Sequence, residues 1–234
     1  MPQLIYAQDL CLLDLGDDEN VFNPDWIREI NTALDQVEAA PGPRALVTLA
    51  RGKFWSNGLD LDWLAANTCG ASTFLDSVHA LLARVLTLPV ISIIQGHAFA
   101  GGAMLALAHD YRVMRAGRGF FCLPEVDISL PFTPGMSALI RSRLSQRTAH
   151  TAMTTGHRYG GHDALNEGIV DLTAPQDEVV RVSAELAAPL AGKAGPTLAA
   201  IKMESYAQAL SALAEPATIP AAAAASQSSD SARP

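Results

Sequence analysis

The sequence is poor in cysteine and contains no spacing typical of a metal site. Its three cysteines, Cys11, Cys69 and Cys122, include no closely spaced pair, and their odd number leaves at least one unpaired. This usage favours reduced thiols in an intracellular compartment over a disulfide-bonded secreted fold. The six histidines show neither an HxH nor an HExxH spacing, so the sequence predicts no zinc site.

Two further absences exclude other classes of protein. No apolar segment reaches the length of a membrane span, and the N-terminus lacks the charged and apolar blocks of a secretory signal. The formal net charge of −8 argues against a general nucleic-acid or anionic-membrane surface. With 234 residues, of which 49% are hydrophobic and 17% charged, the chain is long enough for one large domain with a substantial core.

Short apolar runs typical of strands recur along the chain. They cover residues 3–6, 9–14, 45–50, 90–94, 111–114 and 169–174. A first helix is predicted after Asn23-Pro24, where asparagine suits the N-cap and proline the first helical position. Further helices are predicted at 74–85, 102–109, 177–191 and 196–213. This alternation of strands and helices predicts an α/β fold with parallel crossovers.

Two glycine-bearing loops, at 56–61 and 96–102, each follow a predicted strand. Ligand sites in open α/β sheets lie at the carboxyl ends of strands, and glycine leaves backbone N–H groups uncovered. The second loop also begins a helix, whose N-terminus favours negative charge. Side by side, the loops would aim two N–H donors at one oxygen. The alternative interpretation of either loop alone is a tight turn, and neither loop matches a nucleotide-phosphate motif.

A third feature, at 120–128, embeds Glu125 among apolar residues. Burial raises the pKa of a carboxyl group and suits it to act as a general base near neutral pH. The alternative hypothesis is that Glu125 caps a helix or pairs with one of the nearby arginines, Arg112, Arg115 or Arg118. The residues by themselves leave both hypotheses open.

Together these segments resemble the crotonase superfamily, also called the enoyl-CoA hydratase/isomerase family. The resemblance runs from about residue 9 to about residue 210 and is most specific in IIQGHAFAGGAMLALAHDYRVM at 93–114 and FFCLPEVDISLPF at 120–132. It implies a spiral of ββα repeats over 1–175, a helical C-terminal region over 176–214, and assembly into trimers or paired trimers. Residues 215–234 shift in composition to Pro, Ala, Ser and Gln, and we expect them to form a mobile tail.

The resemblance also assigns roles to site residues. The family binds acyl-CoA thioesters and stabilises a thioester enolate with two backbone N–H groups, which by position belong here to Leu59 and Gly101. Each such donor typically lowers the barrier by about 2.7–4 kcal/mol. The hydratases of the family use two glutamates. One position is Glu125, whereas the other is occupied by Met104, which cannot accept a proton.

One acid without its partner fits proton transfer better than addition of water. The resemblance therefore implies a Δ3,Δ2-enoyl-CoA isomerase, in which Glu125 takes a proton from C2 and returns it at C4, with no metal or redox cofactor. Residues 131–135, PFTPG, look most like the plant peroxisomal isomerases. By that resemblance we expect a peroxisomal location, although the C-terminus Ala232-Arg233-Pro234 does not match a peroxisomal tripeptide. A cytoplasmic location is the alternative.

Local cations are needed for the phosphates of an acyl-CoA substrate, because the chain is acidic overall. Arg51 and Lys53 precede the first loop, and Lys202 lies on the last predicted helix, where the family often contacts CoA phosphates. A solvated surface charge is the alternative for each. The predicted substrate-binding residues are Arg51, Lys53, Ser56, Gly58, Asp60, Leu61, Ala100 and Lys202.

Several other residues near the loops have a structural interpretation. We expect His97 to be structural, and Asp60 and Asp62 to anchor the first loop through Asx-type hydrogen bonds. Trp55 and Trp63 flank that loop, and core packing is the default for them.

Two further functions compete with isomerisation. One is another crotonase-type reaction, hydration or thioester hydrolysis, with Asp127 as the second acid. The other is a non-catalytic acyl-CoA-binding protein.

Overall fold

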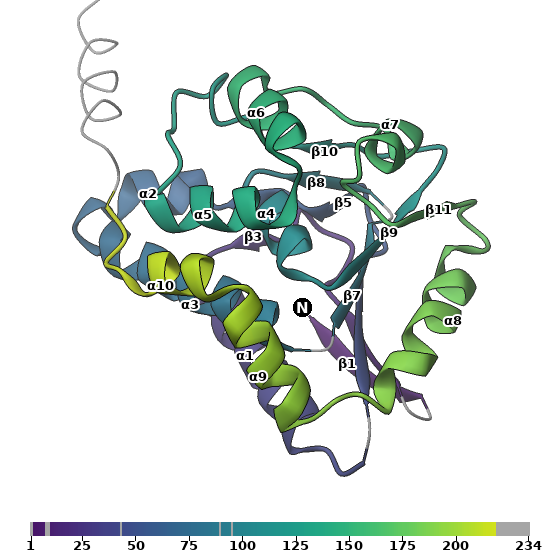
Figure 1. Ribbon diagram of the computed structural model, residues 1–234. Coiled ribbons are helices and arrows are strands. Elements are labelled where there is room, and N and C mark those ends of the chain that lie inside the picture. Colours follow the sequence, from purple (N-terminus) through teal and green to yellow (C-terminus); the bar gives the residue numbers. More distant parts are fainter. Residues whose placement is uncertain (1, 8–9, 43, 89, 95, 219–234) are drawn as a thin grey trace, which may run out of the picture.

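The computed structural model describes residues 2–7, 10–42, 44–88, 90–94 and 96–218. A six-stranded sheet in the order β1-β2-β4-β7-β9-β11 lies between α8 (Val179–Ala191) on one side and α1 (Pro24–Ala39) and α3 (Ala71–Thr87) on the other (Figure 1). Its strands are β1 (Gln3–Ala7), β2 (Leu10–Asp14), β4 (Ala45–Leu49), β7 (Val90–Ile94), β9 (Tyr111–Arg115) and β11 (Leu172–Ala174). β1 and β2 form an antiparallel hairpin, and all other neighbours are parallel. The α/β class and the strands predicted from the sequence are confirmed.

A second, smaller sheet was not predicted. Three short strands, β5 (Phe54–Ser56), β8 (His97–Phe99) and β10 (Phe121–Cys122), form a parallel sheet in the order β10-β8-β5. A further parallel pair joins β3 (Val21–Phe22) to β6 (Gly58–Leu59). Strands of two or three residues are too short to show an alternating pattern, so the sequence predicts only loops in these places.

The two sheets are built from one repeated unit. β4-β5-α3, β7-β8-α4 and β9-β10-α5 each send their first strand to the large sheet and their second strand to the small one. The helices of these units are α3 (Ala71–Thr87), α4 (Gly101–Ala108) and α5 (Pro134–Arg143). This arrangement is the spiral of ββα repeats that the sequence predicts.

Strand β4 is buried on both faces of the large sheet. Ala45 and Val47 of β4 pack in a cluster with Val179 and Ala187 of α8 (Val179–Ala191), whereas Leu46 between them belongs to the main core on the other face. In Figure 1, α8 lies on one side of the sheet and α1 (Pro24–Ala39) and α3 lie on the other. A strand buried on both faces is apolar throughout, which explains the continuous run in β4.

The first long helix begins where the sequence predicts. The side chain of Asn23 accepts a hydrogen bond from the backbone N–H of Trp26 at 2.9 Å, and Pro24 is the first helical residue. Ile27, Ile30 and Leu34 are buried along one face of α1. The predicted N-cap and apolar face are therefore confirmed.

The C-terminal region differs from its prediction in two places. The helix expected over 196–213 is divided into α9 (Pro196–Ser205) and α10 (Ala207–Ala214), because Tyr206 leaves the helical conformation and its ring packs under the guanidinium of Arg143. The mobile tail expected from residue 215 does not begin there. Ala217 is buried, and its N–H donates a hydrogen bond to Asp76 at 2.7 Å. Residues 219–234 lie outside the described residues.

The remaining helices connect these units. They are α2 (Leu61–Ala66), a 3-10 turn at Thr68–Gly70, α6 (Gln146–Thr155) and α7 (Gly161–Asn166). Across the part of the chain that the structure describes, no helix is both long and apolar enough to cross a membrane.

Candidate active site

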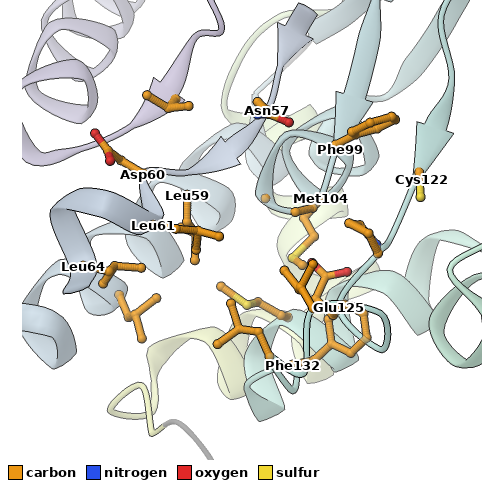
Figure 2. A pocket seen from close by; sticks show the side chains of 18 of the residues that line it. Asn57, Leu59, Asp60, Leu61, Leu64, Phe99, Met104, Cys122, Glu125 and Phe132 are labelled. Carbon is orange, nitrogen blue, oxygen red and sulfur yellow. The ribbon is translucent and has the colours of Figure 1, made fainter. Parts of the chain in front are cut away.

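A cavity of about 580 Å³ opens beside the N-terminus of α4. Residues of β6, β8, α2, α3, α4 and α5 and the segment after β10 all contribute to its wall. Much of this wall is apolar and includes Leu64, Leu75, Met104, Leu130, Phe132 and Met136. Figure 2 shows Leu64 and Phe132 toward one end of the cavity, and Phe99 and Cys122 toward the other. Such a wall suits an apolar ligand with few polar groups.

The two glycine loops touch at one corner of this cavity. Gly58 has a φ of +81°, and a β-carbon added there would lie 2.6 Å from the backbone nitrogen of Gly101 and 2.9 Å from the carbonyl oxygen of Phe99. No side chain larger than that of glycine fits at this contact. The prediction that the loops lie side by side is confirmed.

The backbone N–H groups of this corner come from two different elements. Gly101 is the first residue of α4, so its N–H has no acceptor inside the helix. The N–H of Asp60 donates to the carbonyl oxygen of Phe22 at 2.9 Å. Consecutive N–H groups of a strand point to opposite edges, so the N–H of Leu59 points away from β3. Leu59, Ala100 and Gly101 all line the cavity.

Ala100, immediately before α4, has an unusual backbone conformation. Its φ of +50° and ψ of −122° lie in a region that residues other than glycine rarely adopt. Such a conformation costs on the order of 1–3 kcal/mol and persists only where the surrounding structure fixes it. Here it turns the chain from β8 into α4 and presents the first N–H groups of the helix.

Ser56 holds the first loop in place through hydrogen bonds and does not line the cavity. The side chain is fully buried, its hydroxyl donates to the carbonyl oxygen of Asn20 at 2.8 Å, and it accepts from the N–H of Gly58 at 3.2 Å. The structure thus places Ser56 behind the loop rather than on the cavity wall where its prediction put it. Gly58 also acts through the backbone contact to Gly101, since it is not part of the cavity wall.

Glu125 lies in the turn after β10 and lines the cavity with an exposed fraction of only 4%. Its Oε2 has no hydrogen-bond partner among the residues that the structure describes. Burial raises the pKa of this carboxyl group to about 8. Figure 2 shows the side chain beside Met104. A carboxyl group in these surroundings is poised to exchange a proton near neutral pH.

The structure does not support the alternative hypothesis that Glu125 forms an ion pair with a nearby arginine. Arg112 instead lies 3.5 Å from the carboxylate of Asp171 and donates to the carbonyl oxygens of Ile169 and His109. No ion pair of Glu125 occurs within the described ranges. The hypothesis of a buried proton-transfer group is thus favoured.

The other carboxylates of the cavity wall are bound elsewhere or exposed. Asp60 caps α2 by accepting from the N–H of Trp63 at 2.9 Å, as its Asx-type prediction requires. Glu19 accepts from the amide of Asn57 at 3.0 Å, and Asp62 is exposed. Met104 is buried and lines the cavity. Among the described lining residues, Glu125 is therefore the one buried acid.

Two of the predicted phosphate-binding cations are committed to carboxylates of this chain. Lys202 is 5% exposed, pairs with Asp110 at 2.7 Å and also donates to the carbonyl oxygen of Leu88. The structure therefore does not place Lys202 on the cavity wall, where its prediction as a phosphate-binding residue put it. Its position on a helix gave no sign of the buried partner, Asp110, elsewhere in the chain. Arg51 pairs with Asp14 at 2.6 Å and does not line the cavity.

Trp55 and His97 have the structural roles expected of them, and Trp63 packs against the core. Trp55 is fully buried in the core, and Trp63 packs against the ring of Phe74 at 4.9 Å between centroids. The ring of His97 stacks on that of Phe120. None of the three lines the cavity.

Sequence reasoning missed several residues of the cavity wall. Thr133 caps α5 by accepting from the N–H of Met136 at 3.2 Å, and its hydroxyl lies 2.7 Å from Nε2 of the buried His79. Thr133-Pro134 is a recognisable helix start, yet that signal does not reveal the cavity beside it. Arg158, a cation in the wall, follows α6 and gives no local signal of its position.

Comparisons with known proteins agree with this architecture. Residues 8–231 match the family model described as "Enoyl-CoA hydratase/isomerase". Enoyl-CoA delta isomerase 2, peroxisomal, from Arabidopsis thaliana is 38% identical over 215 residues, covering 85% of this chain and 89% of that protein. Enoyl-CoA delta isomerase 3 from the same plant is 36% identical over 211 residues, with the same coverage of 85% and 89%.

Solved structures extend the likeness to the whole spiral. A probable enoyl-CoA hydratase, EchA3, from Mycobacterium tuberculosis H37Rv superposes with a TM-score of 0.84 at 27% identity, covering 98% of each chain. A second structure of the same protein, described as an apo enoyl-CoA isomerase, gives a TM-score of 0.83 at 26% identity, over 97% of this chain and 98% of that one.

Proposed function

The chain belongs to the enoyl-CoA hydratase/isomerase family, and from this premise we propose that it is an enoyl-CoA isomerase that moves a double bond from C3 to C2 of an acyl-CoA thioester. The acyl chain lies along the apolar wall of the cavity, and the thioester carbonyl lies at the corner where the two glycine loops meet. Glu125 is the acid–base residue of this reaction.

The proposed mechanism needs only a proton transfer and an enolate. The carboxylate of Glu125 removes a proton from C2 of a 3-enoyl thioester, and the electron pair moves onto the carbonyl oxygen. The N–H groups of Leu59 and Gly101 donate hydrogen bonds to this oxyanion, and because they are fixed in the backbone they need no reorganisation. Glu125 then returns the proton at C4, and the C=C bond forms between C2 and C3.

The observation that carries the proposal is a single buried acid in the cavity. Glu125 is desolvated and its Oε2 has no hydrogen-bond partner among the described residues, which makes it a stronger base than an ordinary carboxylate once it is ionised. Met104 occupies the position of the second glutamate of the family's hydratases and can neither activate nor protonate a water molecule. One group that shuttles a proton between two carbons suffices for isomerisation.

The competing hypothesis of hydration or hydrolysis lacks a second acid. Asp127, the carboxylate considered for this role, is exposed and does not line the cavity. A relative named carnitinyl-CoA dehydratase, from Escherichia coli K12, is 33% identical over 160 residues, or 68% of this chain and 61% of that protein. In this chain, however, Met104 stands where the resemblance places the second glutamate of the family's hydratases.

Three further expectations belong to the same proposal. The isomerisation is redox-neutral and backbone N–H groups hold the enolate oxygen, so the proposed mechanism needs neither a redox cofactor nor a metal ion. The relatives named peroxisomal support a role in peroxisomal β-oxidation of unsaturated acyl chains. Assembly into trimers or paired trimers remains the family-based prediction for the oligomeric state, and size-exclusion chromatography with light scattering measures it.

The proposal is tested by supplying the purified chain with 3-hexenoyl-CoA and following the ultraviolet absorbance of the conjugated 2-enoyl thioester. We expect conversion by the unaltered chain and a loss of about 10³-fold or more in kcat for Glu125→Gln, because an amide cannot accept the proton. Asp127→Asn is the matched control, since it removes an exposed carboxylate two residues away.

Near-normal turnover by Glu125→Gln would contradict the assignment of this residue. Hydration of 2-hexenoyl-CoA at a rate comparable to isomerisation would favour the competing reaction instead. Tight CoA binding without turnover of any enoyl thioester would identify a binding protein.

A further inference from the structure

The C-terminal end of α4 is buried, and its carbonyl groups are bound by side chains from outside the helix. α4 is eight residues long, carries no charged side chain and is buried along its whole length. The last carbonyl groups of a helix have no partner inside it, and when buried they must find one elsewhere. Here they accept hydrogen bonds from two guanidinium groups and an imidazole.

Arg143 makes most of these hydrogen bonds. It is the last residue of α5, which packs beside α4 (Figure 1). Its Nε donates to the carbonyl oxygen of Leu107 at 2.9 Å, and its Nη2 donates to those of His109 and Asp110 at 2.8 and 3.0 Å. The rigid fork of a guanidinium group holds such carbonyl groups at fixed positions relative to one another.

Tyr206 holds Arg143 in this position from the C-terminal region. The guanidinium group lies 5.1 Å from the centroid of the Tyr206 ring, and its Nη1 donates to the hydroxyl of the same residue. Tyr206 stands between α9 and α10, where the helical conformation is interrupted. A cation over an aromatic ring is attracted to its face, and the hydrogen bond fixes the direction of the fork.

Two further side chains bind the same end of α4. Nη1 of Arg112 donates to the carbonyl oxygen of His109 at 2.9 Å. Nδ1 of His109 lies 2.7 Å from the carbonyl oxygen of Leu105, and its Nε2 lies 2.9 Å from the hydroxyl of Thr48. Because a carbonyl oxygen only accepts, Nδ1 carries the proton. Burial lowers the pKa of His109 to about 3, so the ring is neutral.

The N-terminal end of α4 is positioned differently, by close packing. A β-carbon on Gly102 would lie 2.4 Å from the carbonyl oxygen of Ser56. One on Gly101 would lie 3.2 Å from the ring of Phe22. Contacts of this kind set a lower limit to the distance between the helix and the first glycine loop. Their attraction is weak, so the hydrogen bonds at the other end are what oppose a withdrawal of the helix.

A short helix transmits a displacement from one end to the other. With a rise of about 1.5 Å per residue, the carbonyl groups bound by Arg143 lie roughly 12 Å from Gly101 along the axis of α4. An N–H group stabilises an oxyanion only at a distance of about 2.7–3.1 Å. A misplacement of about 1 Å can therefore cost on the order of 100-fold in rate.

We propose that Arg143, held by Tyr206, is a positioning residue of the reaction, which fixes the oxyanion donor Gly101 through α4. The inference rests on the proposed function, in which the N–H of Gly101 binds the thioester oxygen. Arg143 does not line the cavity, so it acts on the substrate only through the helix. The cationic groups at this end also interact favourably with the helix dipole.

The first test separates kcat from KM in the isomerisation of 3-hexenoyl-CoA. For Arg143→Met we expect kcat to fall about tenfold or more and KM to stay within about twofold, because the donor acts mainly on the enolate. Tyr206→Phe keeps the ring but removes the hydroxyl, and we expect a loss of about threefold in kcat. Arg141→Met is the matched control, because Arg141 is exposed on the same helix.

Infrared spectroscopy tests the position of the donor without relying on turnover. Hexanoyl-CoA with an isotope-labelled thioester carbonyl has no C=C bond to move, and hydrogen bonds lower the stretching frequency of its C=O bond. We expect a lower frequency in the complex with the wild type than in the free thioester. In Arg143→Met the frequency moves back toward the free value, whereas in Arg141→Met it stays at the wild-type value. A loss of stability alone does not shift this band in a folded variant.

The two readouts together decide the proposal. A wild-type kcat in Arg143→Met would overturn it, and so would a fall in kcat without a change of the carbonyl frequency. If circular dichroism shows that Arg143→Met does not fold, Tyr206→Phe decides by the same readouts.

Failure of the proposed function gives a different result. A frequency that is lowered in the wild type and restored in the variants supports the positioning role even if the chain isomerises no enoyl thioester. A frequency that is not lowered in the wild type would overturn both the positioning role and the oxyanion donors.

Discussion

Gly58 and Gly101 are in backbone contact: a β-carbon on Gly58 would lie 2.6 Å from the nitrogen of Gly101. The two loops that carry the proposed oxyanion donors are therefore positioned by each other, with no side chain between them. Because a packed backbone contact cannot adjust to an added atom, the spacing of the donors depends on the glycine at position 58.

The first prediction concerns this contact. Gly58→Ala forces the two loops apart and also places alanine at a φ of +81°. We expect kcat to fall by about 100-fold, since one oxyanion donor contributes that much, and the free energy of unfolding to fall by about 2 kcal/mol. Steady-state kinetics and chemical denaturation measure both effects.

Gly42→Ala is the control for this substitution. Gly42 has a similar φ of +86°, but nothing lies within 4 Å of its β-carbon position. We expect a loss of about 1 kcal/mol in stability from backbone strain and normal kinetics. Equal losses of activity in both variants would show that loop packing is not the cause.

The second prediction concerns pH. The pKa of Glu125 is raised to about 8 by burial, and the group must be ionised to accept a proton. We expect kcat/KM to rise about tenfold per pH unit below this value and to level off above it. A rate that is flat between pH 6 and 8 in the unaltered chain would contradict Glu125 as the base.

The same group makes the stability depend on pH in a defined direction. The folded protein keeps the proton up to a pKa of about 8, whereas the ordinary pKa of a glutamate side chain is 4.5. Between these values the folded state binds more protons than the unfolded state, so the free energy of unfolding falls as pH rises. Glu125→Gln lacks this titration, so its stability relative to the wild type is expected to increase across this window.

Much of the fold could be predicted because its signals are local. Asn23 and Pro24 mark the start of α1, and the apolar run at Ala45–Leu49 marks a buried strand. The two- and three-residue strands of the small sheet carry no such periodicity and form only because neighbouring repeats pair with one another. Their existence is a property of the tertiary structure.

In the candidate site, too, the residues marked by a local motif could be predicted, whereas those positioned only by the tertiary structure could not. Glu125, Leu59 and Gly101 were predicted from motifs, and all three line the cavity. The position of Lys202 away from the cavity could not be predicted, because its partner, Asp110, is distant in sequence and no pattern links the two. Arg158 was missed for the same reason, since its position at the cavity depends on how the segment after α6 returns to β10.

The third prediction tests the missing acid. Met104→Glu places a second carboxyl group in the cavity beside Glu125, so that one group can activate water and the other can protonate carbon. We expect measurable hydration of 2-hexenoyl-CoA and a melting temperature lowered by several degrees, because an additional carboxyl group is buried. Liquid chromatography of the 3-hydroxyacyl product reports the reaction.

Met104→Gln separates acidity from shape in this experiment. Glutamine has nearly the same size as glutamate and is also polar, but it does not transfer a proton in this way. Hydration by the glutamine variant at the rate of the glutamate variant would show that the second carboxyl group is irrelevant.

The fourth prediction concerns Lys202. The ammonium group of Lys202 is buried and lies 2.7 Å from the carboxylate of the half-buried Asp110, so Lys202→Met removes this charge-assisted hydrogen bond, at a cost of about 2 kcal/mol in stability. Because the ammonium group does not reach the cavity wall, the KM of the CoA thioester is expected to stay unchanged. A raised KM in a variant of normal stability would restore the role first predicted for this lysine.

The two N–H donors belong to the main chain, whereas the groups at positions 104 and 125 are side chains. Substituting one of these side chains therefore leaves the hydrogen bonds from the two N–H groups to a thioester carbonyl in place. After gene duplication, one or two codon changes at these positions can alter the reaction, while the two backbone N–H groups that bind the thioester oxygen are kept. The same backbone can therefore serve several reactions of acyl thioesters, and the side chains around the cavity decide which reaction takes place.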